Sequence, residues 1–97
     1  MAFIVEFLDE AIEQLKTVAL RDRRAIWRRI LRLGEDPHGP GTSALRHELQ
    51  GYWKLRVGDY RVIYEVQGSR MVVLVVTVGH RRHVYEAAQR IAKRRRG

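Results

Sequence analysis

Two short stretches of this sequence hold the side chains best suited to chemistry on a phosphate group. The first carries three cations on two strand-like runs: Lys54, Arg56 and Arg61. The second, residues 78–85, carries Arg81, Arg82, His83 and Tyr85. Arginines donate paired hydrogen bonds to non-bridging phosphate oxygens and stabilise the extra charge of a pentacoordinate transition state. A tyrosine beside them can stack on a base or relay a proton, so we expect Arg81 and Tyr85 to act together.

A tight hairpin should bring the first three cations together. Gly58-Asp59, with glycine first, predicts a two-residue turn of type II′ or I′. In the resulting register Val57 faces Tyr60, Arg56 faces Arg61, Leu55 faces Val62, and Lys54 faces Ile63. Lys54, Arg56 and Arg61 then share one face of the sheet, and the other is apolar, with Trp53, Leu55, Val57, Tyr60, Val62 and Tyr64. Because like charges repel, we expect a bound phosphate to offset them. The alternative is that they are solvated side chains partnered by Asp59 or Glu65.

The histidines raise the question of a metal site. His80 and His83 are spaced i, i+3, while His38 and His47 lie in a loop region. No carboxylate or cysteine spacing accompanies them, and histidines beside arginines suit a bound anion better than a cation. We therefore expect no metal and no other cofactor. His83 remains a candidate proton donor or acceptor near neutral pH.

Hydrophobic periodicity predicts the elements that must position these groups. Residues 2–7 alternate as a strand, and Asp9 is expected to cap a first helix. A second helix should start near Asp22, bury Ile26, Trp27, Ile30, Leu31 and Leu33, and end at Gly34 as its C′ residue. Residues 35–51 read as a loop, followed by strands at 52–57, 60–66 and 71–78, the last an interior strand because it is apolar on both faces. A helix should follow over 84–93, with a frayed tail at 93–96.

These elements predict an α+β fold: an N-terminal strand, a helical hairpin, a three-stranded antiparallel meander and a short C-terminal helix. At 97 residues and 45% hydrophobic composition, we expect residues 1–97 to form a single domain with one core. The sequence has no cysteine and no recognisable signal peptide, and its longest apolar run is too short to cross a bilayer. We expect a cytoplasmic protein without a membrane partner.

The charge of the chain points to a polyanionic partner. Nineteen Lys and Arg against eleven Asp and Glu give a net charge of +8, and the cations are mostly arginine. Nucleic acid, an anionic membrane face and an acidic protein all fit this charge. An arginine-rich genome would produce the same bias without a functional cause.

The motifs resemble those of the RelE toxins of bacterial and archaeal toxin–antitoxin pairs. The resemblance rests on Leu49-Gln50-Gly51, on the run from Trp53 to Tyr64 with its Gly-Asp-Tyr-Arg-Val-Ile-Tyr segment, and on Val78-Gly79-His80-Arg81-Arg82-His83-Val84-Tyr85. It implies a RelE-like fold and a metal-independent endoribonuclease that cuts mRNA in the ribosomal A site. The 2′-hydroxyl would attack the adjacent phosphate and leave a 2′,3′-cyclic phosphate and a 5′-hydroxyl.

The resemblance also assigns roles to residues. Arg61 and Arg81 match the phosphate-stabilising arginines, Tyr85 the stacking or proton-handling tyrosine, and Lys54 a basic catalytic residue. Arg56, Arg82 and His83 are then expected to bind RNA. Some members carry a second lysine where Tyr52 stands, and others use Glu and His, so Lys54, His83 and Tyr85 all remain candidates for the general base. The implied partners are a cognate antitoxin, in a hetero-oligomer that covers the cationic face, together with ribosome-bound mRNA and rRNA.

Two other functions remain open at this point. A ParE-like toxin would share the fold but inhibit DNA gyrase by binding, without nuclease chemistry. A non-catalytic protein would use the basic face only to dock nucleic acid. The cluster of Lys54, Arg56, Arg61 and Tyr85 favours the nuclease, because a gyrase binder has no need of a phosphate site.

Overall fold

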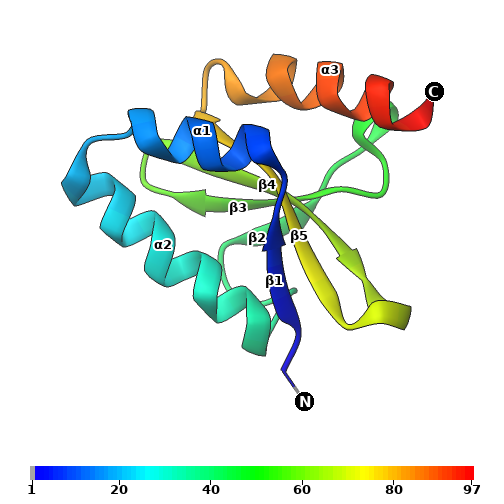
Figure 1. The fold of residues 1–97 in the computed structure, drawn as a ribbon, viewed down its shortest axis with the longest axis horizontal. Coiled ribbons are helices and arrows are strands. Elements are labelled where there is room, and N and C mark those ends of the chain that lie inside the picture. Colours follow the sequence, from blue (N-terminus) through cyan, green and yellow to red (C-terminus); the bar gives the residue numbers. More distant parts are fainter. Residues whose placement is uncertain (1) are drawn as a thin grey trace.

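The computed structural model describes residues 2–97 and is built on a five-stranded sheet (Figure 1). In chain order the elements are β1 (Ile4–Phe7), α1 (Asp9–Thr17), α2 (Leu20–Glu35), β2 (Thr42–Ala44), η1 (His47–Leu49), β3 (Trp53–Val57), β4 (Tyr60–Gln67), η2 (Gly68–Arg70), β5 (Val72–His80) and α3 (Val84–Arg96). The strand order is β1-β5-β4-β3-β2, with β1 parallel to β5 and every other pair antiparallel. No helix in residues 2–97 is both long and apolar enough to cross a membrane.

Helices cover both faces of the sheet, so the apolar side chains form two clusters. On one face, α1 and α2 pack onto Leu55, Val62 and Tyr64. On the other, α3 packs onto Ile63 and Val76. Figure 1 shows α1 and α3 near the same end of the sheet, while α2 runs toward the end where the N-terminus lies. The predicted α+β architecture is therefore confirmed, and β5 is the interior strand that its apolar sequence indicated.

The hairpin between β3 and β4 has the register that its turn predicted. Arg56 pairs with Arg61, and Lys54 pairs with Ile63. Gly58 has a φ of 59°, whereas Asp59 does not adopt a positive φ, which is the pattern of a type II′ turn. Register follows from the turn because a two-residue connection leaves no freedom to slip.

The loop predicted at 35–51 contains one further strand. The three residues of β2 pair antiparallel with β3 at the edge of the sheet, with Thr42 opposite Leu55. Gly41 enters this strand with a φ of 81°, and its carbonyl accepts a hydrogen bond from the Arg56 amide at 2.9 Å. The sheet therefore extends one strand beyond the three-stranded meander that we expected.

Three predicted helix boundaries are wrong. Leu8, not Asp9, is the N-cap of α1, and Asp9 lies in the first turn. The second helix starts at Leu20 rather than near Asp22. Gly34 lies inside the last turn of α2 rather than beyond it, and its carbonyl accepts a hydrogen bond from the Phe3 amide at 2.6 Å. A Cβ at Gly34 would lie 3.0 Å from the Phe3 carbonyl oxygen, so this glycine permits the close approach of the N-terminal segment to α2.

The buried stripe of α2 is narrower than the apolar pattern suggested. Ile26, Ile30 and Leu33 are buried, but Trp27 is 44% exposed and Leu31 50% exposed. Each of the latter follows a core residue directly, so it lies about 100° further around the helix, away from the sheet. The Trp27 ring stacks on Phe7 at a centroid distance of 5.5 Å and otherwise faces outward.

The C-terminal helix extends further than predicted, because its arginine tail is docked rather than frayed. Helix α3 continues to Arg96. Arg94 forms an ion pair with Glu10 of α1, and Arg96 donates a hydrogen bond to the carbonyl oxygen of Glu48. These side-chain contacts attach the tail to two other elements, α1 and η1.

Candidate functional site

The cationic face of the hairpin meets the first turn of α3. Lys54 lies on the face that carries Ile63, and α3 packs against Ile63. The Lys54 ammonium lies 5.9 Å from the centroid of the Tyr85 ring, which is within the range of a cation–π contact. Tyr85 is half-buried and packs against the cluster under α3, so its ring has a structural role as well as contact with a cation.

The turn between β3 and β4 positions both arginines that the sequence singled out. The Arg61 guanidinium donates to the carbonyl oxygens of Gly58 and Tyr60 at 3.0 and 2.8 Å. The Arg81 amide donates to the carbonyl oxygen of Asp59 at 2.8 Å. Two residues before Arg81, Gly79 of β5 pairs with Arg61. The pairing of β4 with β5 therefore brings two residues twenty positions apart to one turn.

Carboxylates neutralise little of this cationic face. Within residues 2–97, no carboxylate lies within 4.0 Å of Lys54, Arg56 or Arg61 in an ion pair. Arg81 has one partner, Asp59, with its Nε 3.9 Å from Oδ1. Both side chains of that pair are more than half exposed, so the pair contributes little and competes weakly with an anionic ligand.

Arg82 and His83 extend the basic surface toward the start of α3. Both are exposed, and His83 is the N-cap of α3. The Arg82 amide donates to Nδ1 of His80 at 3.2 Å, which fixes the turn between β5 and α3. The His80 and His83 rings are 6.2 Å apart. Over residues 2–97, no three His, Cys, Asp or Glu side chains come together as a metal-binding group.

Our reading of the sequence missed a polar cluster at the far end of α3. Arg95 donates to the Tyr52 hydroxyl at 2.8 Å and to the two carboxylate oxygens of Glu65 at 3.3 and 3.4 Å. Burial acts to raise the pKa of Glu65, but hydrogen bonds from Gln67 and Arg95 outweigh it, and the pKa lies below its usual value. The three partners are 30 and 43 residues apart in sequence, so no local spacing could have revealed them.

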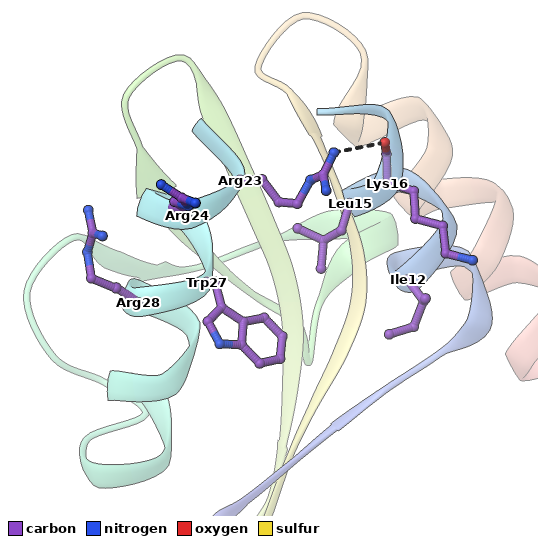
Figure 2. Close-up of a pocket in the computed structure, with 7 residues that line it drawn as sticks. All are labelled: Ile12, Leu15, Lys16, Arg23, Arg24, Trp27 and Arg28. Carbon is purple, nitrogen blue, oxygen red and sulfur yellow. Dashed lines mark hydrogen bonds between the residues drawn. The ribbon is translucent and has the colours of Figure 1, made fainter. Parts of the chain in front are cut away.

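A second candidate site is an apolar groove between α1 and α2 (Figure 2). Its volume is about 440 Å³, and Ile12, Leu15 and Trp27 form its apolar surface. Its rim is basic, with Lys16, Arg23, Arg24 and Arg28. Figure 2 shows Arg23 reaching across to the Lys16 carbonyl oxygen, which accepts its hydrogen bond at 3.3 Å. The exposure of Trp27, which the sequence predicted to be buried, was the missed signal for this groove.

Comparison with known proteins identifies relatives of the whole fold. The family described as ParE toxin of type II toxin–antitoxin system, parDE, matches residues 5–85. The toxin–antitoxin complex RelBE2 from Mycobacterium tuberculosis contains a chain that is 26% identical, with a TM-score of 0.76 over 82% of this chain and 99% of that one. The isolated Escherichia coli RelE toxin is 26% identical, with a TM-score of 0.71 over 93% of this chain and 99% of that one.

A third structure shows the same fold at lower identity. The YoeB/ParE toxin from Agrobacterium tumefaciens is 20% identical, with a TM-score of 0.70 over 80% of this chain and 98% of that one. No curated protein sequence matches the chain.

Proposed function

Since the chain belongs to the ParE toxin family of type II toxin–antitoxin systems, within the RelE/ParE superfamily, we propose that it is an endoribonuclease. Its substrate is mRNA in the ribosomal A site, and its chemistry requires no metal. One observation supports the proposal: the turn Gly58–Tyr60 accepts hydrogen bonds from the Arg61 guanidinium and from the Arg81 backbone amide, and in the described chain Arg61 has no carboxylate partner while Arg81 is only weakly paired.

The proposed reaction is an intramolecular transesterification of the RNA backbone. The 2′-oxygen forms a bond to the adjacent phosphorus while the bond from phosphorus to the 5′-oxygen breaks. The products are a 2′,3′-cyclic phosphate and a 5′-hydroxyl. Arg61 and Arg81 donate to the non-bridging oxygens, where negative charge grows in the transition state.

Proton transfer falls to the neighbouring groups. The 2′-hydroxyl loses a proton and the leaving 5′-oxygen gains one. Lys54 and Tyr85 lie in contact, and His83 is two residues from Tyr85, so these three are the candidates for both transfers. Arg56 and Arg82 are exposed and would bind the flanking phosphates of the RNA.

A second candidate function is inhibition of DNA gyrase. The observation in its favour is that the matching family is described as ParE toxins. In that case the segment Val78–Arg82 would bind the target protein, and Lys54 and Tyr85 would have no chemical role.

The proposed partner that restrains the toxin is an acidic antitoxin. Several structures with this fold are toxin–antitoxin complexes, including that of Mycobacterium tuberculosis. The groove between α1 and α2 offers an apolar floor and a basic rim, which matches a helix with one apolar face and acidic flanks. We assign this groove to the antitoxin, in a hetero-oligomer with this chain.

The test is cleavage of mRNA by the purified toxin on programmed ribosomes, with the new 5′ ends mapped. Wild type should cut at A-site codons, and the variant with both Arg61→Ala and Arg81→Ala should not. The matched control combines Arg21→Ala with Arg28→Ala, which removes the same charge from α2 and should still cut. Intact mRNA with wild type, together with inhibited supercoiling by gyrase, would replace this proposal with the second candidate.

A further inference from the structure

Another cleft, distinct from the α1–α2 groove, lies between α1 and α3, on the side of α3 away from Lys54. It comprises two adjoining cavities of about 530 and 290 Å³, and both are lined by Gln14, Thr77, Ala87 and Arg90. The smaller cavity also reaches His80 and His83. The cleft therefore begins at the turn that carries Arg81 and continues along α3.

The floor of the cleft is a strand edge without a neighbouring strand. Strand β1 ends at Phe7, opposite Val75, so the rest of β5 has no strand beside it on that edge. The last backbone bond there joins the Leu8 amide to the Val75 carbonyl at 2.9 Å, and within residues 2–97 none joins α1 to β5 beyond it. Alternate residues of a strand direct N–H and C=O groups toward each edge. Val76, Thr77 and Val78 are at most 1% exposed, so on this edge only the half-buried Gly79 and His80 can offer backbone groups to a ligand.

The side of the cleft formed by α3 is positively charged and leaves room for a ligand. His83, Ala87, Arg90 and Arg94 follow one another at helical spacing along this side of the helix. Arg94 closes the far end by pairing with Glu10, whereas Arg90 has no carboxylate partner in the described chain. The small side chain of Ala87 leaves the centre of the wall open, and Ile91 adds an apolar surface.

We propose that this α1–α3 cleft binds a nucleotide of the substrate RNA next to the scissile phosphate, an inference that rests on the proposed ribonuclease function. Arg90 would bind the phosphate. The exposed Gln14 amide and the backbone of the half-buried Gly79 and His80 present the donors and acceptors that read the edge of an unstacked base. The larger cavity, of about 530 Å³, falls in the range of pockets that hold small organic ligands, about 300–1,000 Å³, and the smaller one extends it toward His80 and His83. The contiguity with His80 and His83 places this subsite beside Arg81 rather than on a remote surface.

Two substitutions test the cleft without touching the proposed catalytic groups. Ala87→Leu fills the centre of the cleft, and Arg90→Ala removes its unpaired cation from an exposed position. The matched controls are Gln89→Leu, which adds the same side chain at an exposed position of α3 outside the cleft, and Arg21→Ala. Thermal unfolding followed by circular dichroism establishes that each variant is folded.

Two readouts separate binding from chemistry. The first is the concentration of programmed ribosomes that gives half-maximal cleavage, compared with the maximal rate. The second is the dissociation constant for a short RNA with a 2′-O-methyl group at the scissile position, which blocks cleavage. We expect both cleft variants to raise both concentrations about tenfold, the scale of losing the contacts to one base, while the maximal rate changes less than threefold.

The outcomes distinguish the two proposals. If Arg90→Ala and Ala87→Leu are folded and cleave mRNA as wild type does, the cleft assignment is overturned. The proposed ribonuclease function then still stands. A wild type that neither cleaves mRNA nor binds the methylated RNA overturns both. A loss confined to the cleft variants, absent from Gln89→Leu and Arg21→Ala, supports the subsite.

Discussion

The Arg95 cluster makes the most direct prediction about how α3 is held on the sheet. Arg95→Ala removes the donor to the Tyr52 hydroxyl and to both carboxylate oxygens of Glu65. Glu65 then stays in a partly buried position without its cation. Arg96 provides a control, because it is exposed and donates only to a backbone carbonyl.

The expected loss of unfolding free energy follows from how exposed the Arg95 and Glu65 side chains are. Hydrogen bonds to charged groups contribute about 1.5–3 kcal/mol when buried, and exposed ion pairs contribute about 0.2–1 kcal/mol. The side chains of Arg95 and Glu65 are 30% and 27% exposed, which lies between these limits. We therefore expect Arg95→Ala to lower the free energy of unfolding by about 1–2 kcal/mol, and Tm by about 5–10 °C for a chain of this length. Arg96→Ala should change it by less than about 0.5 kcal/mol.

The pH dependence has a defined sign. Because the pKa of Glu65 is lowered in the folded state, the fold favours the carboxylate. This contribution is fully present above the unfolded pKa of about 4.5 and is lost as the pH falls through the folded value. Wild type should therefore lose more stability between about pH 6 and 3 than Arg95→Ala does.

The assay is urea unfolding of wild type, Arg95→Ala, Glu65→Gln and the double variant across that pH range. The double-mutant cycle isolates the coupling between the two side chains. A coupling below about 0.3 kcal/mol at pH 7, or equal losses for Arg95→Ala and Arg96→Ala, would refute the reasoning.

Four further predictions follow from other contacts. Lys54→Ala should reduce the maximal rate of mRNA cleavage by about 10²–10⁴-fold while leaving RNA binding nearly unchanged, as single-turnover kinetics would show. Trp27→Ala should weaken antitoxin binding at least tenfold in calorimetry, because it removes the floor of the α1–α2 groove without touching ribosome-dependent cleavage. Gly34→Ala should destabilise the fold by about 1–3 kcal/mol in urea unfolding, because the new Cβ meets the Phe3 carbonyl, whereas Gly68→Ala, which meets nothing, should be neutral. Burial raises the pKa of Tyr64 to about 12, so the fold favours the neutral phenol and should lose stability between about pH 10 and 12. Tyr64→Phe should remove that alkaline loss in unfolding curves measured across the same range.

Short-range sequence patterns correctly predicted those parts of the fold that depend on neighbouring residues alone. The two-residue turn at Gly58-Asp59 set the β3–β4 register, so the pairing of Arg56 with Arg61 was predictable. Strand β2 was not, because three residues flanked by loop carry no alternation to detect. The exposure of Trp27 was also hidden, since the width of a buried helical stripe depends on how much sheet lies beneath it.

The arrangement of the candidate site depends on long-range pairing. A register shift between Ile63 and Tyr64 in the β4–β5 ladder places Gly79 opposite Arg61. A bulge of this kind inserts one residue into a strand and cannot be read from the alternation of an apolar run such as Val72–Val78. The sequence therefore offered the candidate site residues, while the backbone contact that brings Arg81 to the hairpin turn came only from the structure.

The parallel pairing of β1 with β5 has a consequence for biosynthesis. Ile4 lies opposite Val72, and β5, which follows the other four strands in the sequence, lies between β1 and β4 in the sheet. A growing polypeptide cannot close this sheet until Val72 to His80 have left the exit tunnel, and pairing between such distant segments is slow. The Arg81 amide can reach the Asp59 carbonyl only after β5 has paired with β4. The turn that carries Arg81 therefore takes its place only when β5 has joined the sheet, whereas α1, α2 and the β3–β4 hairpin rest on shorter-range contacts that can form earlier.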